Sequence, residues 1–219
     1  MNVFTRILFG IVLLWATVPA WSQKPVADVA WLIVPGKGFG AITAESSEAQ
    51  LVKHFGRDNV RSEDIDMGEG ETEPGTVVFP DDPVRRVEVL WKDAKEKRFP
   101  WRIQIYGQKS LWHTREGVSL GTTLRELERI NGKPFKLAGF AWDYSGTVYS
   151  WEGGALENAL MPKDKWHLTV RLDEPAPGNP RVTDEERLSV LGEGEFRSDH
   201  PVMQKINPRI YTVSLGFDE

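Results

Sequence analysis

The fold of this chain is decided by two short windows that share one pattern. The first reads Ser47-Glu-Ala-Gln-Leu-Val-Lys-His-Phe-Gly56, and the second reads Thr123-Leu-Arg-Glu-Leu-Glu-Arg-Ile-Asn-Gly132. Each opens with Ser or Thr followed three residues later by Gln or Glu, which is the capping box that starts a helix. Each ends, nine residues after the cap, with the glycine that closes a helix. Both windows therefore predict a short helix.

The two windows lie 76 residues apart, and their surroundings agree at the same offset. Leu51 corresponds to Leu127 on the apolar face of each helix. Upstream, the pair Ile42-Thr43 corresponds to Val118-Ser119. We interpret these agreements as an internal duplication.

Strand-like segments follow both predicted helices. Val87, Val89 and Trp91 lie two residues apart, as do Ile103 and Ile105, and this period of two indicates half-buried strands. The expected strands span 76–79, 84–91 and 101–106 after the first helix, and 137–142, 147–151 and 166–172 after the second.

The predicted fold class is α+β, with two tandem α-β-β-β units whose antiparallel sheets are each covered by a short helix. The first repeat would span 23–107 and the second 108–219. A third capping box at Thr183 predicts a further helix that runs toward Gly192, and a last strand is expected over 210–217. This strand would add to the second sheet, although the sequence leaves open one domain or two.

The first residues have the composition of a targeting segment. Arg6 precedes the uncharged run 7–18, and Ala20 and Ser22 occupy the small-residue positions of a signal-peptidase site. A run of this length is short of the roughly 20 residues of a spanning helix. We predict a signal peptide over 1–22, with an uncleaved anchor as the alternative. The mature chain would then be periplasmic or secreted, without a membrane span.

The composition of the chain excludes some classes of partner and some kinds of chemistry. The formal charge is −5, and an acidic chain argues against nucleic acid, which is bound by basic faces. The chain contains no cysteine, so it has no disulfide, no thiol nucleophile, no thiolate metal site and no lipidated cysteine. Stability must come from an ordinary hydrophobic core.

The phrases Gly117-Val-Ser-Leu-Gly-Thr-Thr-Leu-Arg-Glu-Leu127 and Gly132-Lys-Pro-Phe135 resemble a helix found in two families. One is the tandem helix-plus-sheet repeat of the beta-lactamase inhibitory protein, and the other is the small lipoproteins of the barrel-assembly machinery. The phrase Gly139-Phe-Ala-Trp-Asp-Tyr144 also looks like one in secreted bacterial proteins. The resemblance covers about 36–172 and implies fold and compartment. It transfers no target, because the disulfides of the first family and the lipidated cysteine of the second are missing.

Tryptophan is the most unusual component, with seven rings after residue 22. Large rings fill the core between small sheets and helices, but a concave sheet lined with them would also suit a protein loop or a sugar ring. The binding surface is predicted at Trp112, Trp142, Asp143, Tyr144 and Trp151. Trp142-Asp143-Tyr144 is the best local candidate, because it combines two rings with a carboxylate just before a glycine turn. The expected partner is a protein or glycan of the cell envelope.

Catalysis is the less favoured interpretation. The sequence has no nucleophile-elbow motif and no His-Glu-x-x-His, so we predict no catalytic residue, no metal site and no cofactor. The alternative is a hydrolase of an envelope polymer, with Asp143 and Glu152 as acid and base if they face one cleft. The acidic stretch 63–73 is expected to be a solvated loop, with calcium binding as the other possibility.

Overall fold

The computed structural model describes residues 29–68, 70–162 and 167–216. Its architecture is α+β with mostly antiparallel strands, as predicted. The predicted signal peptide and Trp166 lie outside the described residues. Among the helices that the structure describes, none has the length and apolar composition needed to cross a membrane.

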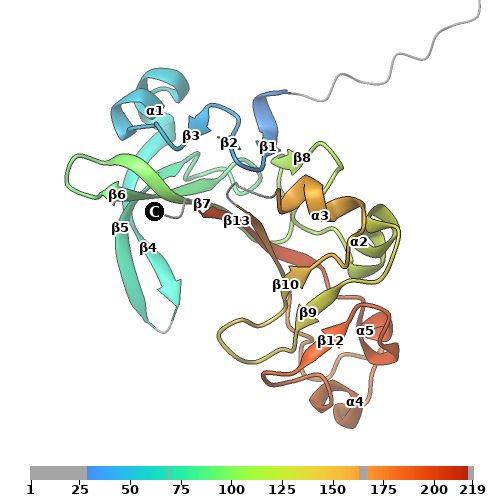
Figure 1. The fold of residues 1–219 in the computed structure, drawn as a ribbon. Coiled ribbons are helices and arrows are strands. Elements are labelled where there is room, and N and C mark those ends of the chain that lie inside the picture. Colours follow the sequence, from blue (N-terminus) through green and yellow to red (C-terminus); the bar gives the residue numbers. More distant parts are fainter. Residues whose placement is uncertain (1–28, 69, 163–166, 217–219) are drawn as a thin grey trace, which may run out of the picture.

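One curved sheet of nine strands runs through the molecule in the order β12-β9-β10-β11-β13-β7-β6-β5-β4 (Figure 1). Every neighbouring pair in it is antiparallel. The strands are β4 (Val60–Gly68), β5 (Glu71–Val78), β6 (Val87–Asp93), β7 (Arg98–Tyr106), β9 (Lys136–Ala138), β10 (Thr147–Ser150), β11 (Leu168–Leu172), β12 (Glu195–Arg197) and β13 (Ile210–Gly216).

The register of the strands builds one apolar face. Residues paired across antiparallel strands share a face, so paired apolar residues form continuous rows. One row runs Thr76, Val89, Ile103, Leu215 and Leu168, and the next runs Ile105, Val213, Val170, Val148 and Leu137. All ten side chains are buried, and the nine apolar ones belong to one core that spans both halves of the chain.

Three helices cover this apolar face (Figure 1). The two windows that predicted helices are confirmed as α1 (Glu48–Phe55) and α2 (Leu124–Asn131). Both capping boxes are formed, with Ser47 and Thr123 as the N-caps, and both helices end at the predicted glycine. The third helix, α3 (Ala155–Leu160), was not predicted, and it buries Leu156 and Leu160.

The remaining elements close the two ends of the structure. A small sheet in the order β3-β2-β1-β8 contains β1 (Leu32–Val34), β2 (Gly38–Phe39), β3 (Ile42–Thr43) and β8 (His113–Thr114). The 3-10 helix η1 (Val29–Trp31) precedes β1, and the 3-10 helix η2 (Arg57–Asn59) joins α1 to β4. At the other end lie α4 (Asp184–Leu188) and α5 (Pro201–Ile206) beside β12 (Figure 1). The helix capped by Thr183 is thus confirmed, although it ends at Leu188 rather than near Gly192.

The finer prediction of two α-β-β-β units is not confirmed. Four strands of the large sheet and then β8 follow α1, and α3 interrupts the strands that follow α2. The last strand, β13, pairs with β7 on one side and with β11 on the other. The strands of both halves therefore form a single sheet, which the sequence could not show because β13 is distant from both partners along the chain.

The acidic stretch 63–73 is not a loop, and that prediction was wrong. Its first part belongs to β4 and its last part to β5, and the two strands form a hairpin. Ile65 explains the strand, because it is buried over Gly75, where a β-carbon would lie 2.2 Å from the Ile65 Cδ1 atom. A single buried residue among many charged ones is too weak a pattern to predict a strand from the sequence.

Candidate functional site

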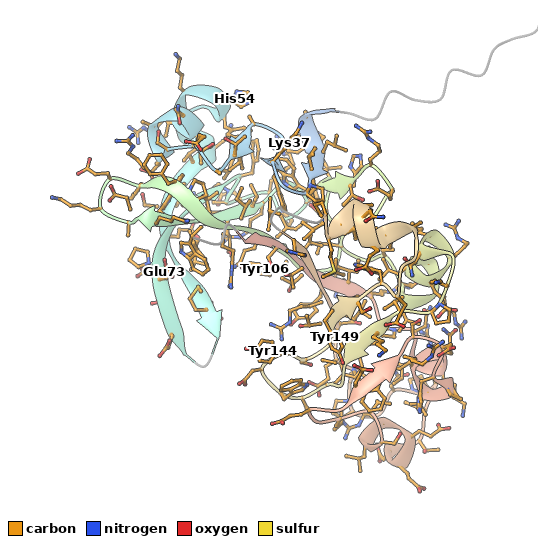
Figure 2. The ribbon with its side chains drawn as sticks, in the orientation of Figure 1. Lys37, His54, Glu73, Tyr106, Tyr144 and Tyr149 are labelled. Carbon is orange, nitrogen blue, oxygen red and sulfur yellow. The ribbon has the colours of Figure 1, made fainter. Side chains whose placement is uncertain are left out.

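The face of the large sheet opposite the helices is open along β7, β13 and β11, whereas Val77, Leu90 and Ile65 on the same face are buried. Tyr106, Thr212 and Arg171 are paired across three neighbouring strands and lie in one row on this face. Figure 2 shows Tyr106 below the sheet, with Glu73 on one side of it and Tyr144 and Tyr149 on the other. Tyr106 is 52% exposed although it lies on β7 in the middle of the sheet. The curvature of the sheet makes this face concave (Figure 1).

Two β-bulges add further side chains to the open face. In the first, Leu90 opposes Arg102 while Trp91 opposes Pro100, so Trp101 is an extra residue in β7. In the second, the register shifts between Arg171 and Leu172 and leaves Tyr211 as the extra residue in β13. A bulge redirects a side chain relative to the regular pleat. Both bulges occur at the edge of one groove.

The open face contains a groove of about 430 Å³. Its floor is formed by side chains from β6, β7, β11 and β13, and one wall is formed by the far end of β4. The floor residues are Arg86, Glu88, Arg102, Gln104, Tyr106, Arg171, Tyr211 and Thr212, and the wall residues are Asp64, Asp66, Met67 and Gly68.

Part of the charge in the groove is compensated internally. Arg86 donates to Glu88 Oε1 at 2.9 Å and to Glu63 Oε2 at 3.2 Å, and Gln104 Nε2 donates to Glu88 Oε2 at 2.9 Å. Burial opposes the charge of Arg86, but the carboxylates more than offset it and raise the pKa of this arginine. Glu88 is buried and ion-paired, as a buried carboxylate has to be.

Arg102 and Arg171 are different, because neither forms an ion pair within the described residues. Arg102 lies over the ring of Trp101, with 4.6 Å between its Cζ atom and the ring centroid. Burial lowers the pKa of Arg102, and the nearby charge of Arg171 lowers it further, although Glu73 acts in the opposite direction. Two half-buried cations thus share the floor of the groove.

Arg171 connects the groove to the predicted Trp142-Asp143-Tyr144 site. Its Nη2 atom donates to the Asp143 carbonyl at 2.7 Å, and its Nε atom donates to the Ser145 carbonyl at 3.2 Å. The loop that joins β9 to β10 is therefore fastened to the edge of the open face.

The same loop is held in one shape by its own contacts. Trp142 Nε1 donates to the Gly139 carbonyl at 2.9 Å, and the Ala141 amide donates to Ser145 Oγ at 3.2 Å. Ala141 has a φ of 64°, a strained left-handed conformation for a residue with a β-carbon. Tyr144 packs against Trp142 with 5.2 Å between ring centroids, yet it remains 63% exposed. This loop presents an exposed ring without having to be ordered first.

Two of the five predicted binding residues lie in the core, which corrects the expectation that they form a surface. Trp112 is fully buried, donates from Nε1 to the Arg85 carbonyl at 2.8 Å, and packs on Trp31. Trp151 is 1% exposed and packs on Phe135. Trp142, Asp143 and Tyr144 do lie at the surface, and their role in binding stays a prediction.

The structure does not bring the predicted acid and base into the groove. Asp143 is exposed in its loop, whereas Glu152 accepts from Ser150 and lies 3.8 Å from Lys136. Neither residue lines the groove. Among the described residues, no three His, Asp or Glu side chains converge in a way that could hold a metal ion.

Sequence reasoning missed the arginines and tyrosines of the groove, namely Arg102, Tyr106, Arg171 and Tyr211. A signal was present for two of them, because Ile103 and Ile105 alternate with Arg102, Gln104 and Tyr106 in one strand. The other face of such a strand is either covered or open to solvent, and only the three-dimensional arrangement decides which.

Comparison of the chain with protein-family models, with curated proteins and with solved structures gave no match. The resemblance of the α2 region to the inhibitory protein and to the barrel-assembly lipoproteins therefore stays an expectation.

Proposed function

We propose that this protein is a non-catalytic binding module that acts outside the cytoplasm and holds a protein or glycan of the cell envelope on the open face of its sheet. The observation that supports this proposal is the groove itself. It combines tyrosine and arginine side chains on a concave surface next to a fastened loop with an exposed ring.

Composition and shape both favour binding. Tyrosine, tryptophan and arginine are the residues enriched where binding energy concentrates. A loop that is already ordered loses little conformational entropy when a partner binds. Tyr106 and Tyr144 would make the central contacts, because both rings are more than half exposed on this side of the molecule.

The predicted duplication would explain how the groove is built. Each half contributes one wall or border, the β4–β5 hairpin in the first half and the loop between β9 and β10 in the second. The central strand β13 joins these halves. We propose that two related units formed the groove when their sheets merged.

The test is binding of the purified protein to a solubilised envelope fraction, measured with the protein immobilised. We expect the double variant Tyr106→Ala/Tyr144→Ala to lose most of the signal. The matched control is Leu188→Ala, which removes a 58% exposed apolar side chain from α4, away from the groove. Equal binding by the double variant and the wild type would contradict the proposal, as would the absence of any bound envelope component.

A further inference from the structure

The two arginines on the floor of the groove require an explanation, because two like charges are held close together there. Each guanidinium presents five N–H donors in a planar fork. Arg171 uses two of its donors on loop carbonyls, and the guanidinium of Arg102 donates no hydrogen bond within the described residues. The remaining donors are those that a bound oxyanion would accept from.

The charges of the groove limit how many negative charges the bound anion can carry. Arg86 is ion-paired with both Glu88 and Glu63, and the wall opposite Arg102 and Arg171 contributes Asp64 and Asp66. The described lining residues therefore carry three arginines and three carboxylates, which sum to zero. A single carboxylate suits such a groove, whereas a doubly charged phosphate would meet the acidic wall.

The rest of the lining points to a ligand that is rich in hydroxyl groups. Met67 contributes the one aliphatic side chain among the residues that line the groove. The centre of a protein interface is commonly more apolar than this lining. Gln104, Thr212 and the acidic wall instead offer hydrogen-bonding groups, while Tyr106 offers a flat apolar surface to the C–H face of a ring.

We infer that the groove binds an acidic glycan, and that Arg102 and Arg171 hold the carboxylate of one of its sugar units. This inference rests on the proposed function, since it names the chemical class of ligand for the same surface. Tyr106 and Tyr211 flank the bound sugar, and the fastened Arg171 keeps its fork in place. Ionic strength weakens the complex, because an ion pair at a partly exposed site is screened.

The experiment is calorimetric titration of the purified protein with a panel of uronic-acid oligosaccharides of different linkage. Each acid is compared with its methyl ester, which keeps the sugar and removes the charge. We expect at least one acid to bind, with its ester about tenfold weaker or worse. Arg102→Gln should weaken binding by roughly 10- to 100-fold, as the loss of a charged hydrogen bond does. Arg98→Gln, at the exposed start of the same strand, serves as the matched control.

Three results would overturn the inference: no acidic oligosaccharide binds, an ester binds as tightly as its acid, or Arg102→Gln binds as tightly as the wild type. A triglutamate peptide and inorganic phosphate complete the panel. If either binds more tightly than the acidic oligosaccharides, the ligand belongs to a different chemical class and the inference is wrong. The same variants distinguish a failure of this inference from a failure of the proposed function. If envelope binding depends on Tyr106 and Tyr144 but survives Arg102→Gln, only the ligand class is wrong. Thermal unfolding of each variant confirms that it is folded.

Discussion

Thr76→Val should destabilise this protein strongly although it changes the shape of one side chain very little. Thr76 is fully buried on the helix-covered face of β5. Its hydroxyl accepts a hydrogen bond from Trp91 Nε1 at 2.9 Å and donates to Glu48 Oε2 at 2.7 Å. It thereby connects β6, β5 and the first turn of α1. Valine fills the same space but can neither accept nor donate.

The cost follows from what each partner loses. Trp91 is 2% exposed, so its indole N–H would remain buried without an acceptor, which costs about 1–3 kcal/mol. Glu48 is half-buried and keeps its bonds to Ser62 and Lys97, so its loss is smaller, about 1 kcal/mol. We expect a total of about 2–4 kcal/mol, equivalent to about 5–15 °C in Tm for a domain of this size.

Urea unfolding at neutral pH measures the difference in free energy. Thr212→Val, the same substitution on the open face of β13, is the matched control and should stay within about 0.5 kcal/mol of the wild type. In a Trp91→Phe background, Thr76→Val should cost about 1 kcal/mol less, because no indole N–H remains to be orphaned. A loss below about 0.5 kcal/mol for Thr76→Val, or strict additivity with Trp91→Phe, would refute this reasoning.

Three further predictions concern charge and burial. Burial raises the pKa of Glu48, but the hydrogen bonds from Thr76, Lys97 and Ser62 outweigh burial and lower this pKa below its usual 4.5. Glu48→Gln should therefore destabilise the protein at neutral pH. Urea titrations should show that this loss of stability shrinks as the pH falls below 4.5. Burial raises the pKa of Asp173 above its usual 3.8, so the charged carboxylate lowers stability at higher pH. Asp173→Asn should therefore raise the Tm at pH 7 but not near pH 3. A difference in Tm between the variant and the wild type that is the same at both pH values would contradict this prediction. Trp112→Ala should cost about 3–5 kcal/mol because the ring is fully buried, whereas Tyr144→Ala should leave the Tm nearly unchanged in the same thermal scan.

The helices could be predicted because their signals are local. A capping box is a contact between residues three apart, and both the Ser47 and the Thr123 boxes form as the sequence indicates. The strands around Val87 and Ile103 were predicted for the same reason, since the apolar residues that indicate each strand lie two apart within one segment. Their pairing partners were not predictable, because β13 enters between β7 and β11 from the far end of the chain.

The candidate site was predicted only in part, and the reason is again distance along the chain. Trp142, Asp143 and Tyr144 are neighbours in sequence, and a cluster of rings beside a glycine turn is visible without a structure. Trp112 and Trp151 were placed on the same surface because composition alone does not separate a buried ring from an exposed one. Arg102 and Arg171 lie 69 residues apart, and only the pairing of β7 and β11 with β13 brings them together.

The open face of the sheet differs from an ordinary solvated face in its unpaired arginines and its exposed aromatic ring. Antiparallel sheets commonly leave one face to water, and such a face needs only polar residues. Here Glu88 accepts hydrogen bonds from both Arg86 and Gln104 at the base of the groove. Beside them, Arg102 and Arg171 form no ion pair within the described residues, and Tyr106, at the end of β7, keeps half its surface in solvent. Stability alone would favour paired charges and covered rings at these positions. The proposed binding of another molecule would explain their unpaired and uncovered state.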